Sequence, residues 1–243
     1  PCHNPHARLA AREEPSRRYG VAGPVLEFRA LDGETVIREG RPVTEWESTS
    51  ARHLAFLLAA HPEGLRRERA IALLWPEVSE EKGNSLFHST LYRVRRALGK
   101  DAVMRRGGVY VLNPSLSPWF DVTEFETLAP QGGRQGDVAH AARARAIALY
   151  RTPFLLTMEG DWSRERRENL HTTMVNLLIR EGRYLAHRQA ADAAEALYQR
   201  ARRMDPFDER AHRGIIWCRA ARGDRAGAIQ VYRQCARTLR CHL

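Results

Sequence analysis

The sequence predicts an α+β fold, in which a small antiparallel sheet, three helices and a hairpin precede an all-α region. Residues 24–47 combine alternating apolar residues with a turn signal, which is typical of short strands. Residues 84–98 carry apolar side chains at helical spacing. Near the C-terminus, two helical segments repeat each other 34 residues apart. We therefore divide the chain into a flexible basic arm, residues 1–23, and two regions, residues 24–113 and 119–243.

The composition favours a polyanionic partner. The 243 residues carry a formal net charge of +10, and lysine occurs only at Lys82 and Lys100, so that nearly all basic residues are arginine. Codon usage in a GC-rich genome would explain arginine in place of lysine, but not the excess of bases over acids. No apolar run approaches the roughly 18 residues of a membrane span, and no signal-peptide core stands at the N-terminus. The sequence thus predicts a cytoplasmic protein without membrane association.

The cysteines predict neither a zinc site nor a disulfide framework. They stand at Cys2, Cys218, Cys235 and Cys241, without CxxC spacing. Cys218 and Cys235 fall in helical patterns and are interpreted as small core residues of a reduced protein. Cys2, His3 and His6 could chelate a metal, but a terminal cluster of this kind is more often a plain tail. We predict no functional metal site and no cofactor.

The small sheet is predicted within residues 24–47. Val25 to Phe28 alternate in character, Asp32-Gly33 is typical of a two-residue turn, and residues 35–37 resume a strand-like composition. Val43 to Trp46 are expected to add another short strand. The sequence therefore places an antiparallel sheet ahead of the first helix.

Two helices are predicted next. Ser48 or Ser50 is expected to cap the first, which runs to about His61. The second runs from about Arg67 to Trp75, where the following proline stops it. An acidic loop over residues 76–83 then leads to a third helix.

This third helix, residues 84–98, has two distinct faces. Phe87, Leu91, Val94 and Leu98 form one apolar stripe, and Gly99 ends the helix. The opposite face carries hydroxyl groups near its start and guanidinium groups near its end: Ser85, Ser89, Tyr92, Arg93 and Arg96, with His88 and Arg95 at the flanks. Such a face suits the DNA major groove, because small polar groups can approach base edges and arginine binds guanine or phosphate. An ordinary charged surface helix is the alternative interpretation.

Residues 102–113 are predicted to form a hairpin. Gly107 and Gly108 make its turn, Arg105 and Arg106 lead into the turn, and Tyr110 lies on the return strand. A sheet, three helices and a terminal hairpin describe a winged helix-turn-helix. The hairpin would be the wing, and its arginines would reach the minor groove or the phosphates.

The region after residue 119 is helical almost throughout. Prolines within residues 114–119 mark the boundary before it. Its repeat is carried by small residues and tyrosines that recur at the tetratricopeptide period: Ala194, Tyr198 and Ala201, then Ala228, Tyr232 and Cys235. Small residues let paired helices approach, and the tyrosines fill the space between them. The sequence therefore predicts an all-α domain with degenerate tetratricopeptide-like repeats.

These features together resemble two known families. Residues 24–113 resemble the OmpR/PhoB-type winged helix, through Leu74-Trp75-Pro76, the run from Leu91 to Leu98, and the predicted wing. Residues 119–240 resemble the bacterial transcriptional activation domain, through Phe120-Asp121-Val122 and the stretch from Asp208 to Tyr232 and beyond. The order of the two is that of the SARP family of regulators.

The resemblance implies a transcription activator that binds double-stranded DNA at direct repeats, as a homodimer, and contacts RNA polymerase. Carried over by position, the DNA contacts fall on Ser85, His88, Ser89, Tyr92, Arg93, Arg95, Arg96, Arg105 and Arg106. The polymerase-facing loop of the winged-helix family corresponds to the acidic loop, with Glu77, Glu80 and Glu81.

The same resemblance raises the question of what accompanies these domains. Residues 1–23 are too short and too polar for the receiver domain that OmpR-type proteins usually carry, so phosphorylation control within this chain is not expected. Relatives usually continue beyond the end of this sequence, which suggests a fragment of a longer regulator, with a nucleotide-binding module as one possibility.

An enzyme and a protein-interaction module are the two alternatives to a DNA-binding protein. An enzyme is disfavoured, because the sequence contains no P-loop, GxSxG or HExxH motif and its carboxylates are scattered. A protein-interaction module remains the alternative, in which the repeats and the winged helix both contact protein and not DNA.

Overall fold

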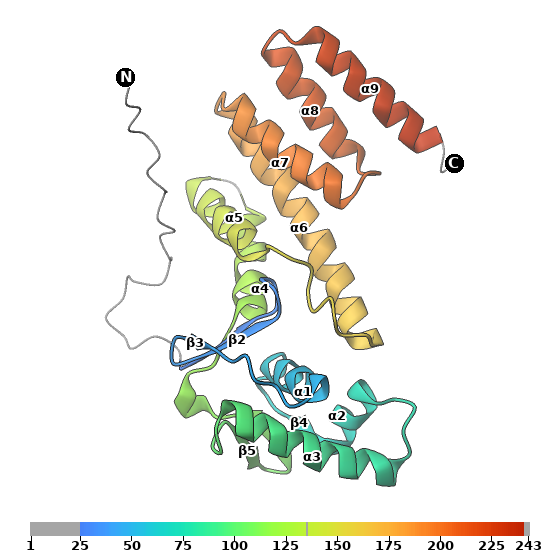
Figure 1. Cartoon of the computed structure of the whole chain (residues 1–243). Coiled ribbons are helices and arrows are strands. Elements are labelled where there is room, and N and C mark those ends of the chain that lie inside the picture. The colour runs from blue at the N-terminus through green and yellow to red at the C-terminus, as the bar shows by residue number, and fades with distance from the viewer. Residues whose placement is uncertain (1–24, 135, 241–243) are drawn as a thin grey trace, which may run out of the picture.

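The computed structural model describes residues 25–134 and 136–240. An α/β part lies at one end of the molecule, with helix α3 (Glu80–Leu98) along its outer face, and the C-terminal helices extend away from it (Figure 1). The predicted basic arm and the candidate chelating residues Cys2, His3 and His6 lie outside the described residues.

The first sheet has the strand order β3-β2-β1-β7. Its strands are β1 (Leu26–Arg29), β2 (Thr35–Arg38), β3 (Arg41–Pro42) and β7 (Trp119–Phe120). The side chains of Leu26 and Phe28 are buried, whereas Glu27 and Arg29 are partly exposed, as the alternation in the sequence predicts. Strand β7 pairs in parallel with β1, so the chain returns to this sheet just before the C-terminal helices begin.

Two details of the predicted sheet are wrong. The third strand is Arg41–Pro42, because beyond it the chain turns locally and Trp46 Nε1 donates a hydrogen bond to the carbonyl of Val43 at 3.1 Å. The connection between β1 and β2 is a loop over residues 30–34 and not a two-residue turn, since Arg29 pairs with Thr35. Two backbone amides of this loop donate hydrogen bonds to Asp121, as described below.

The helices of the α/β part lie close to their predicted positions. Ser48, and not Ser50, caps α1 (Thr49–Ala59), since its side chain accepts a hydrogen bond from the Ala51 amide at 3.2 Å. Helix α2 spans Arg67–Leu74, and α3 begins at Glu80, earlier than predicted.

The hairpin predicted within residues 102–113 is present. Strand β5 (Val103–Arg106) pairs antiparallel with β6 (Val109–Leu112). Gly107 and Gly108 connect them with φ values of 56° and 85°, which glycine adopts without the strain that a Cβ would bring. Strand β4 (Leu65–Arg66) adds to β6 and gives the order β4-β6-β5. Strand β4 was not predicted, because two residues leave no periodic signal.

The remainder of the described chain is mostly helical, with a loop over residues 150–160. After a 3-10 turn at Pro114–Leu116, the helices are α4 (Asp121–Gly132), α5 (Asp137–Leu149), α6 (Asp161–His187), α7 (Ala191–Met204), α8 (Glu209–Ala221) and α9 (Arg225–Arg240). Consecutive helices from α6 to α9 pack against one another, as a tetratricopeptide-like repeat requires (Figure 1).

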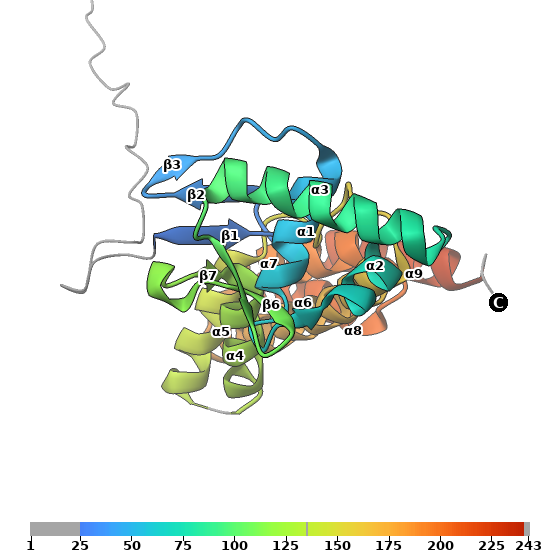
Figure 2. The same ribbon diagram turned by 90° about the horizontal axis from the view of Figure 1, so that it is seen from below.

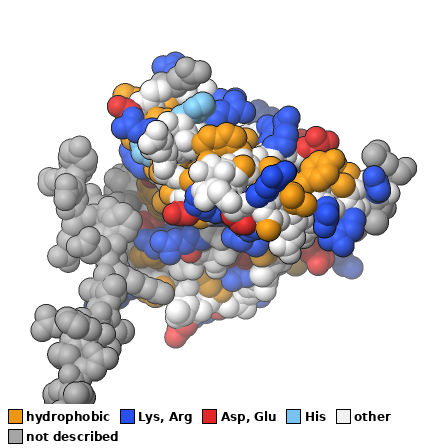
Figure 3. All heavy atoms as spheres, turned by 90° about the horizontal axis from the view of Figure 1, so that it is seen from above, with side chains coloured by type: hydrophobic (Ala, Val, Ile, Leu, Met, Phe, Trp, Pro, Cys, Tyr) orange, Lys and Arg blue, Asp and Glu red, His pale blue; other side chains and the backbone are white. Residues whose placement is uncertain are grey.

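The two repeat tyrosines have different surroundings. Tyr198 on α7 is 6% exposed, and a Cβ added at Gly182 on α6 or at Gly214 on α8 would come within 3 Å of its ring. Tyr232 on α9 is 64% exposed. Figure 3 shows hydrophobic and basic side chains mixed on the face viewed from the side of these C-terminal helices. The repeat therefore packs around its first tyrosine and presents its second to the surface.

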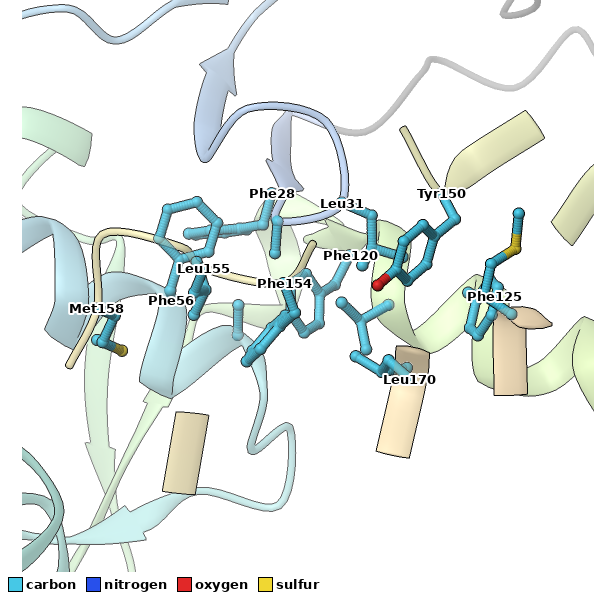
Figure 4. Close-up of a cluster of buried hydrophobic side chains, with 14 of the residues drawn as sticks. Phe28, Leu31, Phe56, Phe120, Phe125, Tyr150, Phe154, Leu155, Met158 and Leu170 are labelled. Carbon is cyan, nitrogen blue, oxygen red and sulfur yellow. The ribbon is translucent and has the colours of Figure 1, made fainter. Parts of the chain in front are cut away.

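The α/β part and the helical part share one hydrophobic core. Phe28, Leu31 and Phe56 from the first part lie in the same buried cluster as Phe154 and Leu155, which follow α5 (Figure 4). Phe28 and Phe56 meet edge to face, with ring centroids 5.8 Å apart. The division at residues 114–119 remains a prediction, because the core continues across it.

Polar contacts reinforce this junction at the β1–β2 loop. The carboxylate of Asp121, at the start of α4, accepts hydrogen bonds from the amides of Ala30 at 2.9 Å and Leu31 at 2.7 Å. The carbonyl of Leu31 in turn accepts from the amides of Arg151 and Thr152, both at 2.8 Å. These bonds fix the orientation of the helical part relative to the sheet.

Candidate nucleic-acid interface

Helix α3 is positioned by its apolar stripe. Phe87, Leu91, Val94 and Leu98 are all buried, as predicted. Glutamates in its first turn and arginines in its last turn each complement the helix dipole. The helix ends at Gly99, whose φ of 102° interrupts the helical conformation. Packing of one stripe leaves the opposite face of α3 at the surface.

The predicted contact face is exposed along most of its length. Ser85, His88, Ser89 and Tyr92 are exposed, and Tyr92 has 62% of its surface accessible. Seen from below, α3 crosses this face of the molecule and the β5–β6 hairpin lies beside it (Figure 2). Leu86 is also exposed here, although the sequence analysis did not single it out. Its place next to Ser85, outside the apolar stripe, was the sequence signal that could have found it.

Arg93 and Arg96 share an acidic partner that the sequence did not reveal. The Glu47 carboxylate lies 2.6 Å from Arg96 Nη1 and 3.9 Å from Arg93 Nε. All three side chains remain substantially exposed, Arg96 to 60%. Glu47 precedes α1 and is far from Arg96 in sequence, so no spacing rule connects them. The carboxylate offsets part of the positive charge at this end of α3.

The guanidinium of Arg95 is directed to the protein backbone. Its Nε and Nη2 donate to the carbonyl of Val103, at 3.3 and 2.9 Å. Because Val103 begins β5, this pair of bonds ties the last turn of α3 to the hairpin. A DNA contact by Arg95 stays a prediction.

The wing arginines are exposed on β5. Neither Arg105 nor Arg106 is buried, and the Arg105 guanidinium carbon lies 6.0 Å from the ring centroid of Tyr110. Tyr110 is buried and packs edge to face on Phe87, with centroids 4.9 Å apart. Tyr110 is thus a packing residue, which holds the hairpin against α3.

The acidic loop is shorter than predicted. The segment between α2 and α3 covers residues 75–79, whereas Glu80 and Glu81 form the first turn of α3. The reason is that the Gly83 amide bonds to the Ser79 carbonyl at 2.8 Å and glutamates favour the positive end of the helix dipole. Glu77 lies in the loop, and all three glutamates are exposed.

The described residues contain neither a cluster of metal ligands nor a helix that could span a membrane. No group of three or more His, Cys, Asp or Glu side chains there is arranged to hold a metal. None of the helices in residues 25–134 and 136–240 is both long enough and apolar enough to cross a membrane.

Comparison with known proteins gives one family and one fold. Residues 120–243, just over half of the chain, match the family described as bacterial transcriptional activator domain. No curated protein matches. Among solved structures, the chain resembles Mycobacterium tuberculosis EmbR in complex with a low-affinity phosphopeptide, at 17% sequence identity and a TM-score of 0.73. The alignment covers 90% of this chain and 61% of that one, so the chain spans about three fifths of the EmbR chain.

The EmbR match supports the arrangement of a small N-terminal sheet followed by a helical domain, and the family match supplies the class of activity. The chain belongs to the bacterial transcriptional activator domain family, whose members are transcription regulators and not enzymes.

Proposed function

We propose that this chain is a SARP-type transcription activator that binds DNA sequence-specifically through α3. The supporting observation is the exposed serine, tyrosine and arginine face of α3 with a basic hairpin beside it. In this proposal residues 24–113 act as an OmpR/PhoB-type winged helix. Helix α3 lies in the major groove, and Arg105 and Arg106 contact the minor groove or the phosphates.

The proposal assigns different roles along α3. Ser85, Ser89 and Tyr92 are exposed near the start and middle of the face, where short polar groups approach base edges. Arg93 and Arg96 follow, as candidates for guanine or backbone phosphate. The protein acts in the cytoplasm as a dimer on direct repeats, and Glu77, Glu80 and Glu81 face RNA polymerase together with residues 119–243.

Loss of either arginine tests the assignment directly. We expect Arg93→Ala and Arg96→Ala each to weaken binding to a duplex selected from genomic fragments by roughly 1–3 kcal/mol, because each removes one charged contact. Fluorescence anisotropy at fixed salt measures this loss. Arg233→Ala on α9 removes the same charge from an exposed site remote from α3 and should bind normally. Wild-type affinity in both α3 variants, with unchanged thermal unfolding, would reject this face.

Glu47→Gln should have the opposite effect. The carboxylate competes with DNA for Arg93 and Arg96, so the neutral isostere releases both guanidinium groups and removes a charge that repels phosphate. Exposed ion pairs contribute about 0.2–1 kcal/mol, so the same anisotropy titration should show binding tighter by up to about fivefold. Glu165→Gln, an exposed change on α6, is the matched control. Weaker binding in Glu47→Gln would mean that Glu47 orients the arginines for DNA.

A protein-interaction module is the second candidate function. It is favoured by the exposed aromatic residues of the last helices, Trp217 and Tyr232. Salt dependence separates the two, since DNA binding by arginines weakens steeply with rising salt. A chain that shows no DNA affinity to lose would support the interaction module.

A further inference from the structure

The β2–β3 hairpin carries two arginines directly opposite each other. Arg38 on β2 pairs in register with Arg41 on β3, across a turn in which Glu39 and Gly40 both have positive φ, 50° and 76°. Opposed residues on antiparallel strands lie on the same face about 5 Å apart, and like charges in that position destabilise the pair. An arrangement that costs stability by itself is favourable when an anion lies between the charges.

The Arg38 side chain faces the end of α3. Residues two apart on a strand share a face, so Arg38 lies on the same side of β2 as the buried Val36. A Cβ added at Gly99 would overlap the Arg38 guanidinium, whose carbon would be only 3.0 Å away. The guanidinium therefore lies against the residue that ends α3, near the negative end of the helix dipole.

The hairpin and α3 line a common groove. Arg38, Arg41 and Arg96 all border a cavity of about 550 Å³ between the β2–β3 hairpin and the last turn of α3. Glu39 and Glu45 also border it, and Glu39 Oε1 lies 3.4 Å from Arg38 Nε. Arg96 is paired with Glu47, whereas Arg41 has no carboxylate within 4 Å among the described residues. Within the part of the chain that the structure describes, Arg41 is thus a basic group without an acidic partner, and it borders the same groove as Arg96 of the proposed DNA-binding face.

We propose that the β2–β3 hairpin binds a backbone phosphate of the DNA in whose major groove α3 lies, with Arg41 and Arg38 as its ligands. This inference rests on the proposed function and extends its contact surface beyond α3 and the wing. A helix that enters the major groove has the phosphate backbone near its ends, and Arg96 connects the groove to the rest of the face. The contact contributes affinity and register, and it reads no base.

The test is the salt dependence of DNA binding by Arg41→Ala. Each phosphate contact contributes about 0.9 to the slope of log K against log salt concentration. We expect Arg41→Ala to lower the slope by about that amount and to weaken a selected duplex and a random-sequence duplex equally. Arg41→Lys, which keeps the charge, should retain the wild-type slope, and Arg233→Ala controls for the lost charge. Circular dichroism of each variant verifies its fold.

Several outcomes would overturn the inference. If Arg41→Ala and Arg233→Ala have the same salt slope, Arg41 does not contact a phosphate. If Arg41→Ala loses affinity for the selected duplex alone, Arg41 contacts a base. Inorganic phosphate distinguishes the source of the anion: if Arg41→Ala abolishes phosphate binding by the DNA-free chain but leaves the slope for DNA unchanged, the site takes free anion and not the DNA backbone. If Arg93→Ala and Arg96→Ala still lose affinity, only the hairpin assignment fails. If the wild-type chain binds no DNA, the proposed function fails as well.

Discussion

Asp121→Ala should cause one of the largest losses of stability of any single substitution outside the hydrophobic core. Asp121 is 2% exposed, and its two carboxylate oxygens accept from the amides of Ala30 and Leu31. Removing the acceptor leaves two buried N–H groups without partners, at roughly 1–3 kcal/mol each. Urea unfolding should therefore show a loss of about 2–6 kcal/mol, relative to wild type.

Asp161→Ala is the matched control for Asp121→Ala. Asp161 also begins a helix, but its side chain is almost fully exposed, and Arg164 at 3.4 Å is its one ionic partner among the described residues. We expect a loss of no more than about 1 kcal/mol there. Equal losses in the two variants would show that the junction bonds add nothing beyond a helix N-terminus.

The same residue predicts a pH dependence. Burial raises the pKa of Asp121 to about 7, against the opposing effect of the amides of Leu31 and Ala30. Because the folded state holds a proton that the unfolded chain releases above its ordinary pKa of 3.8, the stabilisation is complete below that pH and declines as the pH rises toward 7. The slope from this group is at most about 1.4 kcal/mol per pH unit.

Asp121→Asn isolates this titration, since the amide cannot ionise. Between pH 4 and pH 7 the wild type should lose stability relative to the variant, whatever the other carboxylates contribute to both. Parallel stability curves over that interval would mean that the folded and unfolded chains hold this proton equally.

Phe87→Ala is the second substitution with a large expected effect. Phe87 is fully buried on the inner face of α3 and meets Tyr110 of the hairpin edge to face. Truncation leaves a cavity and removes the ring contact with Tyr110 of the hairpin, so we expect a loss of about 3–5 kcal/mol in the free energy of unfolding. Thermal or urea unfolding measures it.

The neighbouring Leu86 provides the control for Phe87. Leu86 is partly exposed on the outer face, so Leu86→Ala should change stability by less than about 1 kcal/mol. Comparison of Phe87→Ala with Arg96→Ala also separates packing from recognition, because Arg96→Ala should alter DNA affinity at unchanged stability. A Phe87→Ala variant as stable as wild type would place the core of this region elsewhere.

Local periodicity accounts for what could be predicted of α3 and the hairpin. The spacing of Phe87, Leu91, Val94 and Leu98 settles which side of one helix is buried, and adjacent glycines settle where a short turn reverses. These signals depend only on neighbours along the chain. The start of α3 was missed for the same reason, since glutamates suit both an exposed loop and a helix N-terminus.

The contacts that define the candidate site depend on distant parts of the chain. Glu47 meets Arg96, Arg95 bonds to Val103, and Arg38 reaches Gly99, and no periodic pattern connects the members of these pairs. The β1–β2 turn was misjudged because its backbone bonds to Asp121 of α4, which lies some ninety residues later. With a two-residue turn, the amides of Ala30 and Leu31 would not be available to donate to Asp121.

The sequence by itself determined the order of the elements, the buried stripe of α3 and the hairpin turn, because each follows from neighbouring residues, and it determined the helical repeat through a pattern that recurs after 34 residues. The tertiary structure decided which arginines pair with a carboxylate, where the α/β part docks on the helices, and which repeat tyrosine is buried. Those outcomes depend on distances between segments far apart in the chain, and hydrogen bonds and ion pairs form only where folding brings such segments within reach.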